Sequence, residues 1–122
     1  MTDNDKVWQS NIYNSIRDLA DINSQRLSWT GKDKENISSF TETLGMLYDS
    51  FAFEDYISFY REKSGENILY KLFVELDCMI SEYQIIGYEL ERKTGVAEQI
   101  LNDVRWIKIT IKGQQIIENW AN

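Results

Sequence analysis

The chain of 122 residues contains no histidine, no proline and a single cysteine. Without histidine, the protein lacks the side chain that most often serves as general acid, general base or metal ligand. With Cys78 alone, neither an intramolecular disulfide nor a thiolate metal cluster can form. The absence of proline and the presence of only six glycines favour long helices joined by short connections.

Long apolar runs and catalytic motifs are missing as well. No segment approaches the ~20 apolar residues of a membrane span. The chain opens MTDNDK, with no apolar stretch behind it that is typical of a signal peptide, so we expect a cytoplasmic protein. There is no glycine-rich phosphate loop, no Gly-x-Ser-x-Gly, no EF-hand spacing and no Glu-x-x-His. The sequence therefore predicts no metal and no cofactor, and an enzyme is the least favoured function.

The chain does have enough apolar material for a core. Hydrophobic residues make up 43% of it and aromatic residues 13%, which argues against disorder. A chain of this length can bury a core without disulfides or metals. We predict an all-α fold: a single domain, residues 1–122, built as a bundle of four to five helices.

The clearest helical pattern lies between Asn67 and Ile86. Its apolar residues recur at spacings of three and four, which marks one broad helix face. A face this wide needs cover on more than one side, so we expect a central helix that Gly87 closes. Residues 88–95 are expected to form a loop or a helical turn that ends at Gly95. The apolar face comprises Ile68, Leu69, Leu72, Phe73, Leu76, Met79, Ile80 and Tyr83.

A first helix is predicted over residues 4–22. The polar segment 23–34 then breaks the helical period and ends in Thr-Gly-Lys-Asp, a composition typical of turns. We expect Leu27 and Trp29 within it to fold back onto the core.

Residues 34–50 and 53–63 are predicted to form the second and third helices. Gly45 lies off the apolar stripe of the second helix and lowers its stability, which favours a close helix crossing there. Cys78, beside the central stripe, is expected to be a small buried thiol. The stripe of the second helix comprises Ile37, Phe40, Leu44, Leu47 and Phe51.

The segment 96–120 fits two patterns. Apolar and polar residues partly alternate over 104–112, which is typical of a strand. A helix that begins at Asn102 or Asp103 fits too, and a lone strand would have no partner in a helical chain. We therefore predict a helix, whose apolar face comprises Trp106, Ile109, Ile116, Ile117 and Trp120.

The net charge of −7 is concentrated in the middle of the chain. Residues 35–89 hold 11 acidic and 3 basic residues, a net of −8, whereas the rest holds 9 and 10, a net of +1. This charge disfavours nucleic acid and anionic membranes as partners. The acidic residues form either a solvated face or a patch that docks a cationic partner.

Tyr56 and Tyr60 lie close in the sequence to Glu54 and Asp55. Tyrosine beside carboxylates is a composition that protein-binding surfaces favour, although both rings also fit a place in the core. If the acidic patch docks a protein, its contacts come from two sets of residues: those around the second and third helices, and the outer face of the central helix. The predicted partner-binding residues are Glu42, Asp49, Glu54, Asp55, Tyr56, Tyr60, Glu75 and Glu82.

Four stretches give the chain a resemblance to a known group of proteins: Trp8-Gln9, SSFTETLGMLYDS (38–50), LFVELDCMISE (72–82) and DVRWIKITIKGQQIIENW (103–120). In these the chain resembles the small, acidic, all-helical bacterial immunity proteins of toxin–immunity systems. The resemblance implies a cytoplasmic inhibitor, without catalytic residues, that binds a cognate toxin domain. An acidic face could steer onto a basic toxin cleft and block it. The alternative is a small structural or regulatory helical protein that self-associates as a homodimer.

Overall fold

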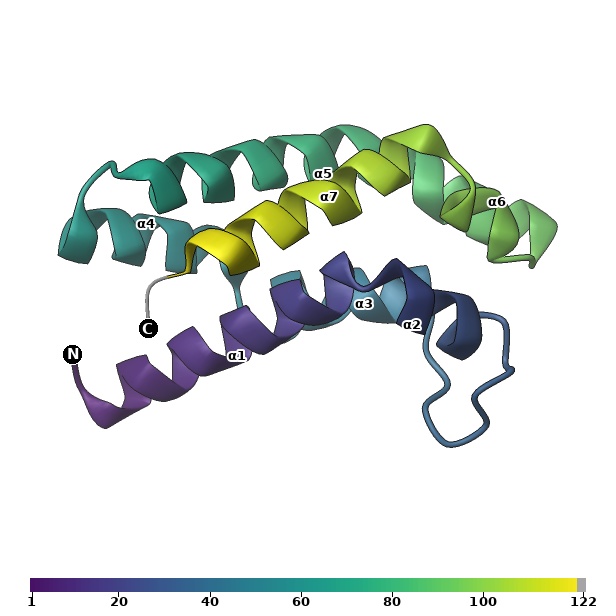
Figure 1. Cartoon of the computed structure of the whole chain (residues 1–122), viewed down its shortest axis with the longest axis horizontal. Coiled ribbons are helices and arrows are strands. Elements are labelled where there is room, and N and C mark those ends of the chain that lie inside the picture. Colours follow the sequence, from purple (N-terminus) through teal and green to yellow (C-terminus); the bar gives the residue numbers. More distant parts are fainter. Residues whose placement is uncertain (121–122) are drawn as a thin grey trace.

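The computed structural model describes residues 1–120, which contain seven α-helices, one π-helix and no strand (Figure 1). The predicted all-α class is confirmed, while the number of helices exceeds the four to five expected. The elements are α1 (Asp3–Ala20), α2 (Ile22–Ser28), α3 (Phe40–Gly45), the π-helix η1 (Met46–Ser50), α4 (Phe53–Ser64), α5 (Ile68–Thr94), α6 (Glu98–Leu101) and α7 (Val104–Asn119).

These elements build four antiparallel limbs of one bundle. Three limbs are the single helices α1, α5 and α7, and the fourth is the succession α3–η1–α4, which we call the broken limb. Helix α7 packs against both α1 and α5, and the broken limb packs against the same two helices. The limbs therefore follow the cyclic order α1, broken limb, α5, α7. The short helices α2 and α6 contact each other at one end, which accounts for the additional helices (Figure 1).

One continuous core, rich in aromatic rings, fills the bundle. Near the start of α1, Trp8 donates from Nε1 to the carbonyl oxygen of Phe51 at 2.6 Å and packs edge-on against Tyr56. Toward the other end, Phe40 packs edge-on against Trp29 and Trp106. The inward position predicted for Trp29 is confirmed.

Helix α2 was not expected from the sequence. Asp21 ends α1 and caps α2, because its carboxylate accepts from the backbone N–H of Ser24 at 3.0 Å. The predicted inward turn of Leu27 is wrong, since that side chain is 50% exposed. The buried residue of α2 is instead Gln25, which donates to the carbonyl of Leu19 and accepts from the indole of Trp106.

The second predicted helix begins later than expected. Ser39, whose hydroxyl accepts from the backbone N–H of Glu42, is the N-cap of α3. Before it, the carboxylate of Asp33 accepts from two following backbone N–H groups, a local turn that competes with helix formation. Ile37 thus lies outside the helix and is 66% exposed, contrary to the predicted stripe.

Helix α5 passes through Gly87 and ends only at Gly95, in the left-handed conformation with φ of 59°. The predicted end at Gly87 is wrong, residues 88–94 are helical, and the end at Gly95 is confirmed. Cys78 is exposed, so its predicted burial is also wrong. None of the described helices combines the length and apolar character that crossing a membrane requires.

The close helix crossing predicted at Gly45 is wrong, and helices α1 and α7 come close instead at Gly113, where an added Cβ would lie 3.0 Å from Cβ of Ala20. A Cβ added at Gly45 would meet only a carboxylate oxygen of Asp49, at 3.8 Å. At Gly87 the same atom would lie 2.3 Å from Cζ of Phe40. Gly87 therefore gives the Phe40 ring its space against α5.

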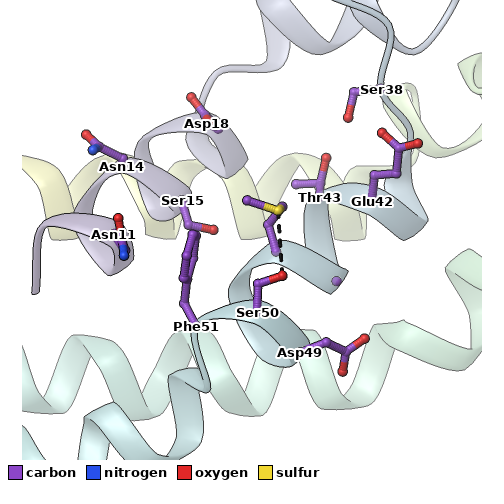
Figure 2. Close-up of a pocket in the computed structure, with 12 residues that line it drawn as sticks. Asn11, Asn14, Ser15, Asp18, Ser38, Glu42, Thr43, Asp49, Ser50 and Phe51 are labelled. Carbon is purple, nitrogen blue, oxygen red and sulfur yellow. Dashed lines mark hydrogen bonds between the residues drawn. The ribbon is translucent and has the colours of Figure 1, made fainter. Parts of the chain in front are cut away.

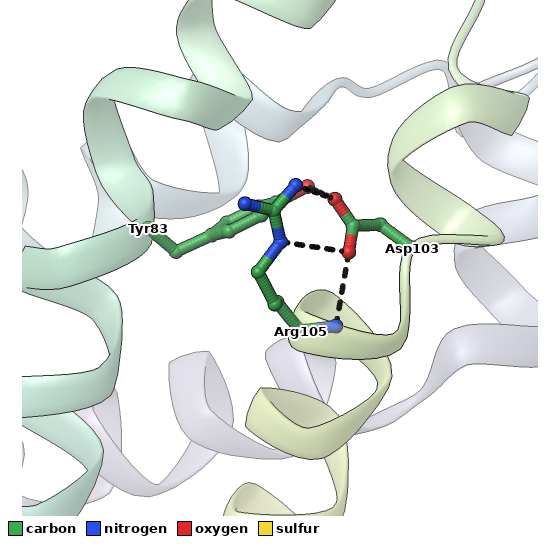
Figure 3. Close-up of polar contacts among 3 residues, drawn as sticks. All are labelled: Tyr83, Asp103 and Arg105. Carbon is green, nitrogen blue, oxygen red and sulfur yellow. Dashed lines mark hydrogen bonds and ion pairs between the residues drawn. The ribbon is translucent and has the colours of Figure 1, made fainter.

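The C-terminal segment is the predicted helix. Asp103 is the N-cap of α7 and accepts from the backbone N–H and the guanidinium of Arg105 and from the hydroxyl of Tyr83 (Figure 3). The guanidinium also lies over the Tyr83 ring, 5.4 Å from its centroid. This cluster ties the start of α7 to α5.

Candidate functional site

A groove runs between α1 and the first half of the broken limb, and we call it the acidic groove (Figure 2). It encloses about 570 Å³, which is space for several side chains of another molecule. Met46, 48% exposed, and Phe51 supply apolar surface, while carboxylates, amides and hydroxyls surround them. The groove is lined by Asn11, Asn14, Ser15, Asp18, Ser38, Glu42, Thr43, Gly45, Met46, Asp49, Ser50 and Phe51.

The groove carries three carboxylates and no cation. Asp18 comes from α1, Glu42 from α3 and Asp49 from η1, and none of the described lining residues is Lys or Arg. Among the described residues none of these three carboxylates forms an ion pair. The groove therefore offers carboxylates that have no ion-pair partner among the described residues, although Arg17 interacts electrostatically with Asp18.

Partial burial gives Asp18 a distinct electrostatic environment. Loss of hydration raises the pKa of its carboxyl above the ordinary value, and Asp21 adds to the rise while Arg17 opposes it. A cation bound beside Asp18 would reverse this effect, since it favours the ionised carboxylate. Asp18 is thus poised to gain from a positively charged neighbour.

A second groove extends the first from Asp18 of α1 toward α2. It shares Asp18, Ser38 and Thr43 with the acidic groove and encloses about 350 Å³ more. Its surface is mainly polar, and exposed Ile37 forms part of its rim. The two together form a trench that could accept an extended segment of another chain.

The backbone of the broken limb is irregular where it forms the groove wall. The π-helix η1 contributes Met46, Asp49 and Ser50, and Ala52 follows in the left-handed conformation, with φ of 52° and ψ of 59°. π-Helical turns and strained non-glycine residues occur disproportionately at functional sites. This irregularity adds a second reason to place function here.

The structure separates the residues predicted to bind a partner. Glu42 and Asp49 line the acidic groove. Glu54 and Asp55 are exposed in the first turn of α4 and do not line it. Tyr56 is only 1% exposed, so its predicted role as a surface contact is wrong.

The remaining predicted contacts lie elsewhere. Tyr60 is half-buried against Phe73, and its hydroxyl accepts from the amide of Asn67 at 2.9 Å. Glu75 and Glu82 line a groove between α5 and α7, and Glu75 pairs with Lys112 at 2.6 Å. These side chains do not join the acidic groove.

Reasoning from the sequence missed the contribution of α1. Asn11, Asn14 and Asp18 recur at spacings of three and four, which places them on one face of α1. That polar face is a detectable signal in the sequence, but it lies outside the acidic region of residues 35–89. Met46, the exposed apolar residue in the groove, was missed as well.

Side chains of these kinds can bind a molecule of complementary charge and shape. Among the described residues, no group of three or more His, Cys, Asp or Glu side chains converges closely enough to hold a metal ion. Carboxylates around an apolar patch suit a segment that carries Lys or Arg next to an apolar side chain. In comparisons with known proteins, no family model, no curated protein and no solved structure matches the chain.

Proposed function

We propose that this protein binds another protein through the acidic groove and that the bound partner is a toxin domain, which the chain neutralises as a bacterial immunity protein in the cytoplasm. The observation that carries the binding proposal is the groove itself. It combines three unpaired carboxylates with an exposed Met46 and has no basic residue along its described lining.

Electrostatics supports a cationic partner. A patch of one sign attracts the opposite sign during diffusion and raises the association rate. Toxin domains that act on nucleic acid need basic clefts, so an acidic inhibitor can reach and cover the cleft quickly. The apolar contact at Met46 would add affinity that salt does not screen.

The toxin identity rests on the resemblance of the chain to small acidic helical immunity proteins. The stretches that carry this resemblance include residues 38–50, which span α3 and η1 and form one wall of the groove. This overlap connects the resemblance with the site.

The first test is a pull-down of the tagged protein from the producing bacterium at low and high salt, repeated with the neighbouring gene co-expressed. We expect one stoichiometric partner whose capture weakens as salt rises. Expressed alone, that partner should arrest growth, and co-expression of this protein should restore it. A partner that is harmless when expressed alone contradicts the immunity function.

Matched charge reversals locate the binding face. The double variant E42K/D49K should weaken the complex on the order of 100-fold, about tenfold for each reversed charge. The control E54K/D55K changes the net charge equally but lies outside the groove, and it should bind nearly as the wild type does. Equal weakening by both variants would mean that net charge, rather than the groove, determines binding.

A further inference from the structure

A separate groove lies between α5 and α7, away from the acidic groove and its extension. We call the surface around it the α5–α7 face. One part encloses about 550 Å³ and a second part about 190 Å³. The two parts share Met79, Glu82 and Lys108, so the groove is continuous along both helices. In the cyclic order of the limbs, this face is opposite the acidic groove, which lies between α1 and the broken limb.

The α5–α7 face exposes apolar side chains. Val74 of α5 is 36% exposed and Ile111 of α7 is 46% exposed, and both line the groove. Met79 and Ile86 are half-buried along its floor. Exposed apolar surface that is continuous and bordered by charge is typical of a protein–protein contact.

The charges on this face are sorted by helix. The carboxylates that line the groove, Glu75 and Glu82, come from α5, whereas Lys108 and Lys112 come from α7. Lys112 and Glu75 form an ion pair across the groove at 2.6 Å. The face is therefore negative along one edge and positive along the other.

We infer that the α5–α7 face binds a second copy of this chain, related by a two-fold axis that runs along the groove. Rotation about such an axis keeps each residue at the same position along the groove and exchanges the α5 edge with the α7 edge. It places α5 of each copy over α7 of the other, with Glu82 opposite Lys108 of the partner subunit. The apolar residues of the two copies then cover each other between the rows of charge.

Other occupants match this surface less well. A two-fold axis across the groove would set α5 over α5 and carboxylates over carboxylates. A partner of one charge sign would be repelled by one of the two edges. Only a partner with both signs in mirrored rows fits both edges, and the chain itself carries that pattern. Because the faces are opposite, this dimer leaves both acidic grooves open.

The test uses two single charge reversals in the full chain, E82K and K108E. Sedimentation equilibrium over a concentration series, with a reductant to keep Cys78 free, should show a dimer for the wild type. Each reversal places like charges opposite each other twice in the homodimer and should weaken association on the order of tenfold or more.

An equimolar mixture of the two variants is the decisive sample. In a mixed dimer, Lys at 82 of one chain faces Glu at 108 of the other, and the second pair is wild-type. Heterodimers should therefore form at concentrations where each variant alone is monomeric. This recovery cannot come from within a chain, because each chain keeps its own mismatched pair.

Controls separate this proposal from loss of folding and from the toxin-binding proposal. Far-UV circular dichroism should show unchanged helix content in both variants. The E42K/D49K variant should dimerise normally, because its changes lie on the opposite face. A wild type that stays monomeric throughout the series, or variants whose mixture does not recover association, would overturn the inference. Neither outcome bears on the acidic groove.

Discussion

Two glycines in helical conformation, Gly87 and Gly45, differ in how much room the surrounding structure leaves for an added Cβ atom. The Cα of Gly87 faces the buried ring of Phe40, which is itself enclosed by other aromatic rings and cannot move aside easily. Gly45 is helical as well, with φ of −60° and ψ of −40°, but a Cβ added there would meet only a carboxylate oxygen of Asp49 at an ordinary contact distance.

We expect opposite effects from the same substitution at these two positions. G87A should lower the free energy of unfolding by about 1–3 kcal/mol, as overpacked cores do. G45A should raise it by up to about 1 kcal/mol, because alanine favours helix more than glycine. Urea denaturation with a common slope measures both. Wild-type stability in G87A would mean that the Phe40 ring has room to shift.

The N-cap residue Asp103 should make stability depend on pH. Hydrogen bonds from Arg105 lower the pKa of its carboxyl, with the bond from Tyr83 acting in the same direction. A carboxyl with a lowered pKa contributes stability that is present above its ordinary pKa of about 4 and is lost as the pH falls through the lower folded value.

D103A should therefore cost about 1–2 kcal/mol at pH 7 and less near pH 3. Asn67 offers an uncharged comparison, because its side chain caps α5 by accepting from the N–H of Tyr70 at 2.9 Å. The cost of N67A should not change with pH. Guanidinium denaturation at both pH values gives the comparison, and a cost of D103A that is constant with pH would rule out the charged cap.

Among the elements, the broken limb departs most from regular geometry. Its two halves meet at Ala52, the one described residue other than glycine with a positive φ. An alanine in this conformation costs roughly 1–2 kcal/mol. Glycine tolerates it but loses about 0.4–1 kcal/mol of backbone entropy on folding.

A52G should therefore stabilise the protein by roughly 0.5–1 kcal/mol, because relief of strain exceeds the entropic cost. Thermal unfolding at a fixed scan rate measures the effect. If A52G binds the partner as tightly as the wild type, the strain itself does not serve recognition. Loss of stability in A52G would show that the alanine methyl group makes contacts that outweigh its strain.

Some elements could be predicted because their signals are local. The apolar period of α4 and the Asp103 cap of α7 can be recognised from residues that are neighbours in the sequence. Both helices form as predicted. The start of α3 was also readable, because Ser39 followed three residues later by Glu42 is a capping-box pattern. The predicted start at residue 34 follows from the apolar period that includes Ile37, and it is too early.

Other features depend on contacts between distant residues. Nothing near Gly87 in the sequence shows that Phe40 packs against it, so the glycine resembled a helix end. The candidate site has the same character. Glu42 and Asp49 were found from local charge density, but Asp18 lies in a part of the chain without net acidity. Only the packing of α1 against α3 and η1 brings the three carboxylates to one groove.

For the whole molecule, the acidic charge opposes stability. Between the described side chains there are three ion pairs: Arg61–Glu66, Arg105–Asp103 and Lys112–Glu75. None involves the acidic groove, although its three carboxylates lie in a protein of net charge −7. Carboxylates gathered without an ion-pair partner repel one another, so the groove should lower stability in the absence of a bound molecule.

The triple variant D18N/E42Q/D49N should accordingly gain stability and lose binding. At pH 7 and low salt, its free energy of unfolding should rise on the order of 0.5–1 kcal/mol, as optimised surface charge does. Because the pKa of Asp18 is raised in the folded state, its charged form destabilises the fold above that pKa. The part of the gain that comes from Asp18 should therefore shrink as the pH falls through the raised pKa of its carboxyl, where the wild-type side chain becomes neutral as well.

E75Q serves as the control because it also removes one carboxylate, but one paired with Lys112. Losing an exposed pair of this kind costs about 0.2–1 kcal/mol, so E75Q should be no more stable than the wild type. Added salt should stabilise the wild type by screening repulsion while it weakens partner capture. If the triple variant and E75Q changed the free energy of unfolding alike, the carboxylates of the acidic groove would not lower stability more than other surface carboxylates do. The charge of the groove would then give no reason to infer a cationic partner.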